Sequence, residues 1–186
     1  MRIVRAAEGR RTPWKNGGGE TMEIAVHPPG AGLDAFEWRV SMALVAADGP
    51  FSNFPKVDRT LAVLTGDGLE LAVGGDAPVR LTAASPPFGF AADAPCTGRL
   101  LGGRVTDLNV MTRRGRFIHS MRRMNVARPA TLDAESGTAV VVCRKGSLLA
   151  GGVVLGPGDA ILFEGTMEIA AHDGAAEAIG VVIQPS

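Results

Sequence analysis

Residues 140–163 read Val-Val-Val-Cys-Arg-Lys-Gly-Ser-Leu-Leu-Ala-Gly-Gly-Val-Val-Leu-Gly-Pro-Gly-Asp-Ala-Ile-Leu-Phe, and this stretch decides the fold class. A valine run ends at Gly146, a second apolar run follows, and the Gly-Pro-Gly-Asp segment at 156–159 leads into a third. Short aliphatic runs bounded by Gly, Pro and Asp are typical of strands joined by tight turns. Residues 59–71, Arg-Thr-Leu-Ala-Val-Leu-Thr-Gly-Asp-Gly-Leu-Glu-Leu, repeat the strand–glycine–strand pattern. The two stretches predict β-hairpins in both halves of the chain.

The composition of the whole chain agrees with an all-β protein. Among 186 residues, 25 glycines and 12 prolines are spread along the chain and separate short runs of Val, Ile, Leu and Ala. No window of a dozen residues shows a clean apolar period of 3.6, which a surface helix requires. Hydrophobic residues make up 46% of the chain, enough for a core. We therefore expect a β-sandwich or a β-barrel.

The charge balance argues against nucleic acids and membranes as partners. Lys plus Arg (19) cancels Asp plus Glu (19), which removes the general attraction to polyanions. Five arginines lie within 113–123 without a helix-turn-helix or zinc-finger pattern, so we interpret them as part of a solvated connector. The N-terminal residues have no apolar signal segment, no run approaches the ~20 apolar residues of a membrane helix, and Cys96 and Cys143 form no CxxC pair. We expect a cytoplasmic protein with reduced thiols.

Alternation along the candidate strands places polar side chains on shared faces. In residues 36–44, Arg39 and Ser41 point away from the apolar side. In residues 104–111, Asp107 and Asn109 share one face, and Thr21 begins a similar strand at 21–26. Such patches face solvent in a sandwich but line the cavity of an open-mouthed barrel, and the pattern leaves both open.

The turn at 155–163 resembles the recurrent turn of cupin barrels. With its counterpart at 59–71, it indicates a duplicated fold, an all-β bicupin made of two RmlC-like double-stranded β-helix (jelly-roll) barrels. The predicted halves are residues 1–112, which carry the pocket, and residues 113–186, packed as one compact unit.

Metal and cofactor chemistry finds no support in the residues. Cupin metal sites resemble His-x-His with a following Glu and a distant third His, the imidazole and carboxylate set that Fe, Mn, Ni or Zn prefers. Here His27, His119 and His172 each lack another His within five residues. No nucleophile elbow, phosphate-binding loop or catalytic cysteine signature occurs either. We predict no metal, no cofactor and no assignable catalytic residue.

Four short motifs occur in order in the first 111 residues: Trp14-Lys15-Asn16-Gly17-Gly18, Trp38-Arg39-Val40-Ser41, Gly49-Pro50-Phe51-Ser52-Asn53-Phe54-Pro55 followed by Asp58-Arg59, and Asp107-Leu108-Asn109-Val110-Met111. Together they resemble the motifs of the HutD/Ves family. The resemblance implies a bicupin without the usual metal ligands, encoded among histidine-utilisation genes or occurring as a stress-associated relative. It further implies a role in restraining histidine catabolism, with a pathway acid such as formylglutamate as ligand.

The side chains in these motifs suit an acid that carries carboxylates and a formamide. Arginine binds a carboxylate through two parallel hydrogen bonds, and a side-chain amide both donates and accepts. We expect Asp107 to orient Arg39 or Arg59, and the N–H groups of Gly17 and Gly18 to bind oxygens. A surface ion pair between Arg59 and Asp58 is the alternative for that arginine. The predicted ligand-binding residues are Asn16, Gly17, Gly18, Thr21, Arg39, Ser41, Ser52, Arg59, Asp107 and Asn109.

The sequence is compatible with three functions. The first is a metal-independent protein that binds a small anionic metabolite and modulates histidine utilisation. The second is a cupin-type isomerase or hydrolase acting on a related acid, with Asp107 or His119 as base. The third is a protein-interaction module, and a homodimer is compatible with each of them.

Overall fold

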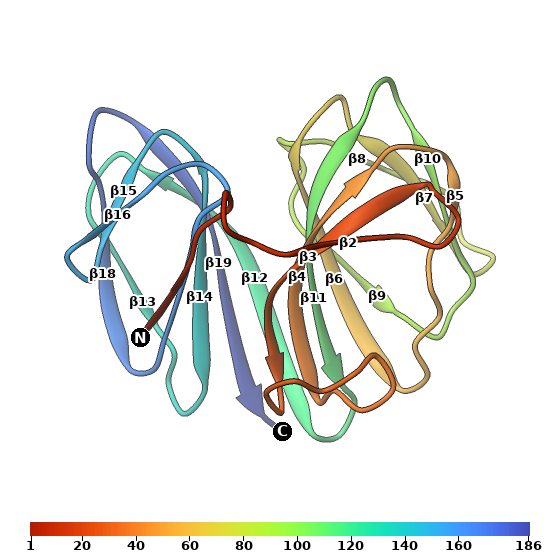
Figure 1. The fold of residues 1–186 in the computed structure, drawn as a ribbon, viewed down its shortest axis with the longest axis horizontal. Coiled ribbons are helices and arrows are strands. Elements are labelled where there is room, and N and C mark those ends of the chain that lie inside the picture. The colour runs from red at the N-terminus through yellow and green to blue at the C-terminus, as the bar shows by residue number, and fades with distance from the viewer. The chain divides into compact units, whose positions relative to one another are not determined.

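A computed structural model describes residues 1–186, which form 19 strands and no helix. The structure therefore contains no helix that could cross a membrane. The chain divides into two compact units; in Figure 1 one runs from red-orange through green, and the other contains the teal-to-blue residues together with the red first residues of the chain. We call residues 10–116 the N-barrel, and residues 1–9 with 117–186 the C-barrel. Each unit contains two antiparallel sheets. The prediction of an all-β protein is confirmed.

The N-barrel pairs a six-stranded sheet with a four-stranded one. The strand order is β2-β3-β4-β11-β6-β9 in the first and β5-β10-β7-β8 in the second. Figure 1 shows β3, β4, β11 and β6 running side by side. The strands are β2 (Arg11–Pro13), β3 (Gly19–His27), β4 (Trp38–Val45), β5 (Gly49–Pro50), β6 (Val57–Thr65), β7 (Leu69–Val73), β8 (Val79–Leu81), β9 (Phe88–Ala91), β10 (Cys96–Leu100) and β11 (Val105–Arg113).

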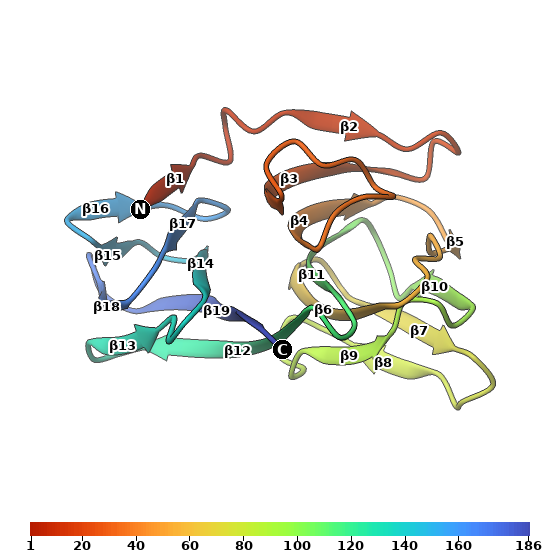
Figure 2. The ribbon, with the colours of Figure 1, turned by 90° about the horizontal axis from the view of Figure 1, so that it is seen from below.

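The C-barrel has a five-stranded sheet, β1-β17-β14-β19-β12, and a four-stranded sheet, β13-β18-β15-β16. Its first strand comes from the start of the chain, because β1 pairs antiparallel with β17 (Figure 2). The strands are β1 (Arg2–Val4), β12 (Phe117–Val126), β13 (Ala130–Asp133), β14 (Thr138–Lys145), β15 (Leu148–Ala150), β16 (Val153–Leu155), β17 (Ala160–Phe163), β18 (Thr166–Ala171) and β19 (Ala176–Pro185).

The unit boundaries differ from the predicted halves of 1–112 and 113–186. Residues 1–9 belong to the C-barrel, because Ile3 lies opposite Ile161 in the β1–β17 pair. The other boundary falls after Arg116, because β11 continues through Arg113 and a short turn separates it from β12. Local sequence patterns carry no sign of a pairing between strands so far apart in the chain.

The turn that the sequence singled out connects β16 and β17 and is held by the Asp159 carboxylate. Asp159 Oδ2 accepts hydrogen bonds from the Gly156 N–H (3.1 Å) and from Arg5 Nη1 (2.7 Å). Asp159 Oδ1 accepts a third from the Ala6 N–H (2.9 Å). Gly158 allows the close approach, because it adopts a φ of 84° and an added Cβ would lie 2.9 Å from the Ala6 side chain. One carboxylate therefore closes the turn and fixes the residues that follow β1.

Replacing Asp159 with alanine should destabilise the C-barrel by about 1–3 kcal/mol, because three donors lose their acceptor. Burial alone would raise the pKa of Asp159, but hydrogen bonds from Ala6, Arg5 and Gly156 hold it below its usual value. A lowered pKa means that this stabilisation is present above about pH 4 and is lost as the pH falls through the folded-state pKa. Thermal melts of wild type and Asp159→Ala at pH 7 and pH 3 test this.

The two melting curves should be well separated at pH 7 and approach each other at pH 3. Asp173→Ala is the matched control, since the Asp173 side chain is 84% exposed in the same unit. An Asp159→Ala protein that melts with the control at pH 7 would contradict the assigned role.

The interiors of the two barrels differ in chemistry. The buried cluster of the C-barrel consists of aliphatic and aromatic side chains, Met124 and Cys143. Burial raises the pKa of the Cys143 thiol to about 11, which keeps it unreactive. The N-barrel instead has two separate apolar clusters, one around Leu61 and Leu71 and one around Phe36 and Met111. Polar side chains lie between them.

Candidate functional site

The polar side chains in the core of the N-barrel follow from the alternation of β11 and β6. Val105 of β11 belongs to the first apolar cluster and Met111 to the second. The side chains between them on the same face of β11 are those of Asp107 and Asn109. Four buried residues in this region, which we call the polar cluster, are Ser41, Arg59, Asp107 and Asn109.

The strand register brings the polar cluster together on one face of the six-stranded sheet. Asn109 lies directly opposite Ser41 on β4 and opposite Leu61 on β6. Arg59 lies two residues before Leu61 and therefore points to the same side. Since Leu61 packs in the core between the two sheets, this is the inner face. The polar patches predicted from alternation thus line the interior of the barrel.

Asn109 bridges the two charged members of the cluster. Arg59 Nε and Nη2 both donate to Asn109 Oδ1, at 2.8 and 2.6 Å. Asn109 Nδ2 in turn donates to Asp107 Oδ1. The Arg59 guanidinium also lies over the Phe51 ring, 4.7 Å from its centroid, and 5.7 Å from that of Phe90. Two aromatic rings and one amide thus fix the orientation of a buried cation.

One buried atom of the cluster has no partner within the protein: Asp107 Oδ2 accepts no hydrogen bond. Arg59 Nη1 and the Ser41 hydroxyl make no hydrogen bond to a protein group either, but neither is a fully buried atom. Native proteins leave few buried polar atoms unpaired, so Asp107 Oδ2 calls for an explanation, such as a ligand or an ordered water.

Burial disfavours the charged form of both Asp107 and Arg59. It raises the pKa of Asp107 to about 6, although the attraction of Arg59 and the hydrogen bond from Asn109 act in the opposite direction. Burial also lowers the pKa of Arg59, against the attraction of Asp107. The carboxyl group therefore changes charge within about one unit of neutral pH, inside a core that offers it no second hydrogen bond.

The predicted orientation of an arginine by Asp107 is indirect in the structure. Asp107 contacts Asn109, and Asn109 holds Arg59. The alternative of a surface ion pair between Arg59 and Asp58 is wrong, because Arg59 is buried and Asp58 pairs with Arg114 at 2.9 Å.

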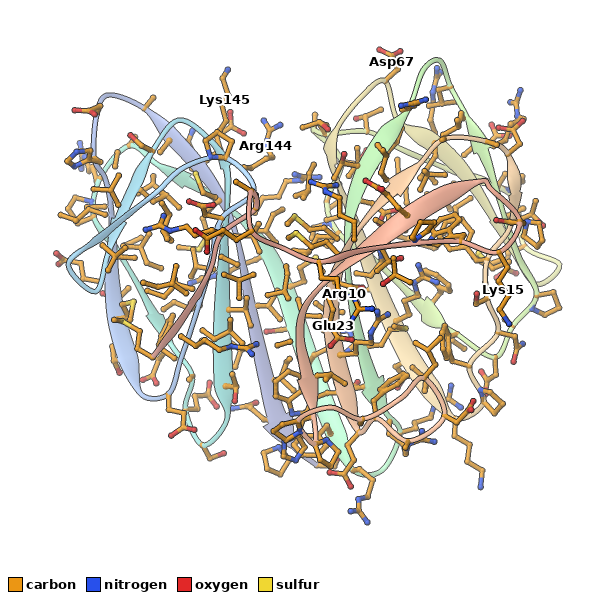
Figure 3. The ribbon with its side chains drawn as sticks, viewed as in Figure 1. Arg10, Lys15, Glu23, Asp67, Arg144 and Lys145 are labelled. Carbon is orange, nitrogen blue, oxygen red and sulfur yellow. The ribbon has the colours of Figure 1, made fainter.

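Arg39 occupies the same inner face as Arg59 but has a different partner. Its Nε donates to Glu23 Oε2 at 2.9 Å, and its side chain is 12% exposed. Met111 lies opposite Arg39 on one side and opposite Arg59 on the other, so the two arginines flank one residue of β11. Arg39 is therefore next to the polar cluster and already neutralised by Glu23, a residue of β3 labelled in Figure 3.

The glycine-rich motif builds the β2–β3 hairpin. The Gly17 N–H donates to the Trp14 carbonyl and the Gly18 N–H to Asn16 Oδ1. The prediction that these N–H groups are available to a ligand is therefore wrong, since closing the turn already uses both. Asn16 is exposed, and Lys15 points outward from the same hairpin (Figure 3). An added Cβ on Gly19 would lie 2.2 Å from the Leu44 carbonyl, which explains the need for glycine there.

Two further predicted residues lie at the margin of the cluster. Thr21 shares the inner face, but its hydroxyl accepts a hydrogen bond from Trp14 Nε1 at 2.8 Å. Ser52 is exposed and follows Phe51, the ring that covers Arg59. The sequence pattern did not indicate the role of either ring. Phe51 could have been proposed because it adjoins the predicted residue Ser52, whereas Phe90 is brought to Arg59 only by the β6–β9 register.

The other candidates lie away from the cluster. A surface recess of about 330 Å³ is lined by Asp34, Ala35, Glu37, Arg113 and Arg116. Both of its arginines already have partners, because Arg116 bonds to Glu37 and Arg113 donates to the main-chain carbonyls of Asp34 and Phe36. No group of three or more His, Cys, Asp or Glu side chains is arranged to hold a metal ion.

Comparison with known sequences gives consistent matches to one family. The sequence matches the HutD family model over residues 6–179. It is similar to a protein of Pseudomonas putida described as an uncharacterized 21.2 kDa protein in the hutC 3′ region, with 40% identity over 111 residues, 60% of this chain and 57% of the relative. It also resembles protein Ves of Cronobacter sakazakii, with 41% identity over 104 residues, 55% of each chain. The chain thus spans about half the length of the curated relatives it matches.

Solved structures extend the likeness to the whole chain. A conserved protein of unknown function from Pseudomonas aeruginosa has a TM-score of 0.87 at 30% identity, covering 98% of both chains. HutD from Pseudomonas fluorescens, in a formate condition, has a TM-score of 0.83 at 28% identity with the same coverage. A cupin 2 conserved barrel domain protein from Leptotrichia buccalis, at 11% identity over 99% of this chain and 97% of its own, has a TM-score of 0.63 and shows the fold alone. The predicted cupin-type fold is confirmed.

Proposed function

Because the chain belongs to the HutD family, whose model it matches over residues 6–179, we propose that it binds a small acidic metabolite without a metal and modulates histidine utilisation. The observation that carries this proposal is a buried carboxylate oxygen without a hydrogen-bond partner, Asp107 Oδ2, in a cluster that also holds the buried Arg59 and Ser41. A barrel core built only for stability, like that of the C-barrel, would be apolar. These groups instead suit a ligand that supplies their missing hydrogen bonds.

Arg59 is the group best suited to an anion. Its guanidinium is planar, permanently charged and held rigidly by Asn109 and Phe51, so little side-chain freedom is lost when a ligand binds. Two of its nitrogens are already used, and Nη1 remains for a carboxylate oxygen. A charge-assisted hydrogen bond of this kind is stronger in a buried site than in water. The Ser41 hydroxyl, opposite Asn109, is a second donor.

The context of the relatives supports a ligand from histidine degradation. The Pseudomonas putida relative is described by its place in the hutC 3′ region, and the Pseudomonas fluorescens HutD structure is of a formate condition. Formate is the simplest carboxylate. Formylglutamate, which joins a formyl group to a dicarboxylic acid, is the ligand we propose, with related intermediates as alternatives.

The test is a series of thermal melts of chelator-treated protein with formylglutamate, formiminoglutamate, urocanate and formate. A ligand at about 100 times its dissociation constant stabilises the folded state by roughly 2.7 kcal/mol, a shift of roughly 5–10 °C for a chain of this size. Arg59→Lys keeps the charge but loses the planar fork, and it should remove most of the shift. Arg99→Lys is the control, because Arg99 is exposed and pairs with Glu70 on the four-stranded sheet. The proposal fails if none of the acids shifts the wild-type melt.

Recovering the ligand after incubation separates binding from catalysis. An enzyme using Asp107 as general base is the second candidate, favoured by the free Oδ2 and by burial that raises the pKa of this carboxyl to about 6. The other base considered, His119, lies on β12 of the C-barrel. An acid recovered unchanged after hours supports binding, and a converted acid supports the enzyme.

A further inference from the structure

We infer that the surface recess of the N-barrel is a second ligand site, which binds free α-amino acids through both their carboxylate and their ammonium group. The recess has a volume of about 330 Å³, within the range of about 300–1,000 Å³ that small-molecule pockets occupy. Its lining combines two arginines, Arg113 and Arg116, with two acids, Asp34 and Glu37. The inference goes beyond the proposed function, because none of these residues belongs to the polar cluster.

Two segments of the N-barrel form the recess. One is the loop between β3 and β4, which carries Asp34 and Glu37, and the other is the end of β11 with the turn that follows it. Both lie at the lower edge of the N-barrel in Figure 1. The Arg113 N–H donates to the Glu37 carbonyl at 2.7 Å and so joins the two segments, while the fully buried Phe36 anchors the loop. The walls of the recess are therefore fixed before a ligand binds.

Arg113 supplies a positive charge that no carboxylate of the protein balances. Its Nε donates to the Phe36 carbonyl at 3.1 Å and its Nη2 to the Asp34 carbonyl at 3.3 Å, and both acceptors are main-chain oxygens. The guanidinium also lies 5.8 Å from the centroid of the Phe36 ring. Arg113 is therefore held in place, and its Nη1 remains for a carboxylate oxygen of a ligand.

The other arginines of this turn differ from Arg113 in having acidic partners. Arg114 pairs with Asp58 at 2.9 Å and with Asp93 at 3.0 Å, and Arg116 pairs with Glu37. The arginine-rich stretch that the sequence suggests as a solvated connector thus places one unbalanced cation in the recess.

Asp34 supplies the matching negative charge. The residue is exposed, and it contacts Arg113 through its main-chain carbonyl, so its carboxylate remains for a cation. The 3.3 Å contact between Arg113 Nη2 and that carbonyl makes the two residues neighbours. A ligand that meets both charges must therefore carry an anion and a cation close together, and an α-amino acid carries both on one carbon atom. A plain anion would add repulsion from Asp34, and a plain cation would add repulsion from Arg113.

The experiment follows the amide signals of isotope-labelled protein by two-dimensional NMR at pH 7 during titration with three compounds of one carbon skeleton. L-Alanine carries both charges, N-acetyl-L-alanine lacks the ammonium group, and L-alaninamide lacks the carboxylate. L-Alanine should shift the signals of Asp34, Glu37 and Arg113. It should bind about fivefold more tightly than either derivative, because each derivative loses one charge pair at a partly exposed site.

Three variants assign the two charges. In Asp34→Asn, L-alanine and N-acetyl-L-alanine should bind equally, because the partner of the ammonium group is gone. In Arg113→Gln, L-alanine and L-alaninamide should bind equally, and Asp34→Asn still tests the site if the loss of Arg113 disturbs the loop. Asp76→Asn is the control and should keep the wild-type preference, because Asp76 is an exposed carboxylate in the turn between β7 and β8.

The inference is overturned if L-alanine leaves the recess signals unmoved. It is also overturned if the wild type binds either derivative as tightly as L-alanine, which would make the recess a site for one charge only. A preference that is lost in Asp76→Asn would contradict the role of Asp34. None of these results affects the proposed function, because that depends on the melts with pathway acids and on Arg59→Lys.

Discussion

Replacing Asp107 with asparagine raises the melting temperature of the ligand-free protein at pH 8 and leaves it unchanged at pH 4. Burial raises the pKa of Asp107 from 3.8 to about 6, so the folded chain holds this proton more tightly than the unfolded chain. The contribution of Asp107 to stability is therefore greatest below about pH 4 and is lost as the pH rises through 6. At 1.36 kcal/mol per pH unit, the loss is roughly 3 kcal/mol.

Asparagine avoids this loss of stability because it cannot ionise. Its N–H₂ group then lies where Asp107 Oδ2 was and finds no acceptor there, which offsets part of the gain. The net gain at pH 8 should be about 1–3 kcal/mol, or roughly 5 °C in the melting temperature. Scanning calorimetry of wild type, Asp107→Asn and the exposed control Asp67→Asn between pH 4 and pH 8 measures it. A variant that melts below wild type at pH 8 would show that the ionised carboxylate stabilises the cluster, contrary to the argument from burial.

Replacing Asn109 with alanine should have the opposite effect and a larger one. The substitution removes the acceptor of two Arg59 N–H groups and the donor to Asp107, and all three residues are buried. Breaking a buried charge network by deleting one partner costs about 3–5 kcal/mol. Ser41→Ala, at the position directly opposite on β4, should cost less than about 1 kcal/mol, because its hydroxyl has no partner to lose.

Urea unfolding of Asn109→Ala and Ser41→Ala provides the comparison. The double variant Asn109→Ala with Asp107→Asn should lose less stability than Asn109→Ala alone, because it leaves one buried charge unpaired instead of two. Equal unfolding midpoints for the two single variants would exclude Asn109 as the bridge of the cluster.

The sequence was informative where a feature depends on neighbouring residues. Alternation along 104–111 placed Asp107 and Asn109 on one face, and the Gly-Pro-Gly-Asp turn indicated the cupin fold. Alternation does not say whether a face is inside or outside, because that depends on the sheet packed against it. The apolar residues on either side of the pair, Val105 and Met111, show in the structure that this face is the core.

The sequence could not show whether Arg39 or Arg59 belongs to the polar cluster, for a similar reason. Arg39 and Arg59 both project from the inner face, and their roles differ only through cross-strand neighbours. Arg39 reaches Glu23, where the β3–β4 register shifts, whereas Arg59 reaches Asn109 and lies next to Phe90 of β9. The Gly17 and Gly18 N–H groups were wrongly assigned to a ligand because the acceptors of their hydrogen bonds lie within the same turn.

The pairing of β1 with β17 has a consequence for the order in which the chain folds during synthesis. The N-barrel is continuous in sequence, so it can close once residue 116 has left the ribosome. In the C-barrel, Arg2 of β1 pairs with Leu162 of β17, so β1 has no partner strand until residues 160–163 have been synthesised. Pairing between strands so far apart in the sequence costs more loop-closure entropy than a local hairpin, and such non-local pairings slow folding. The barrel that carries the polar cluster therefore forms early, and the C-barrel forms late and depends on residues at both ends of the sequence.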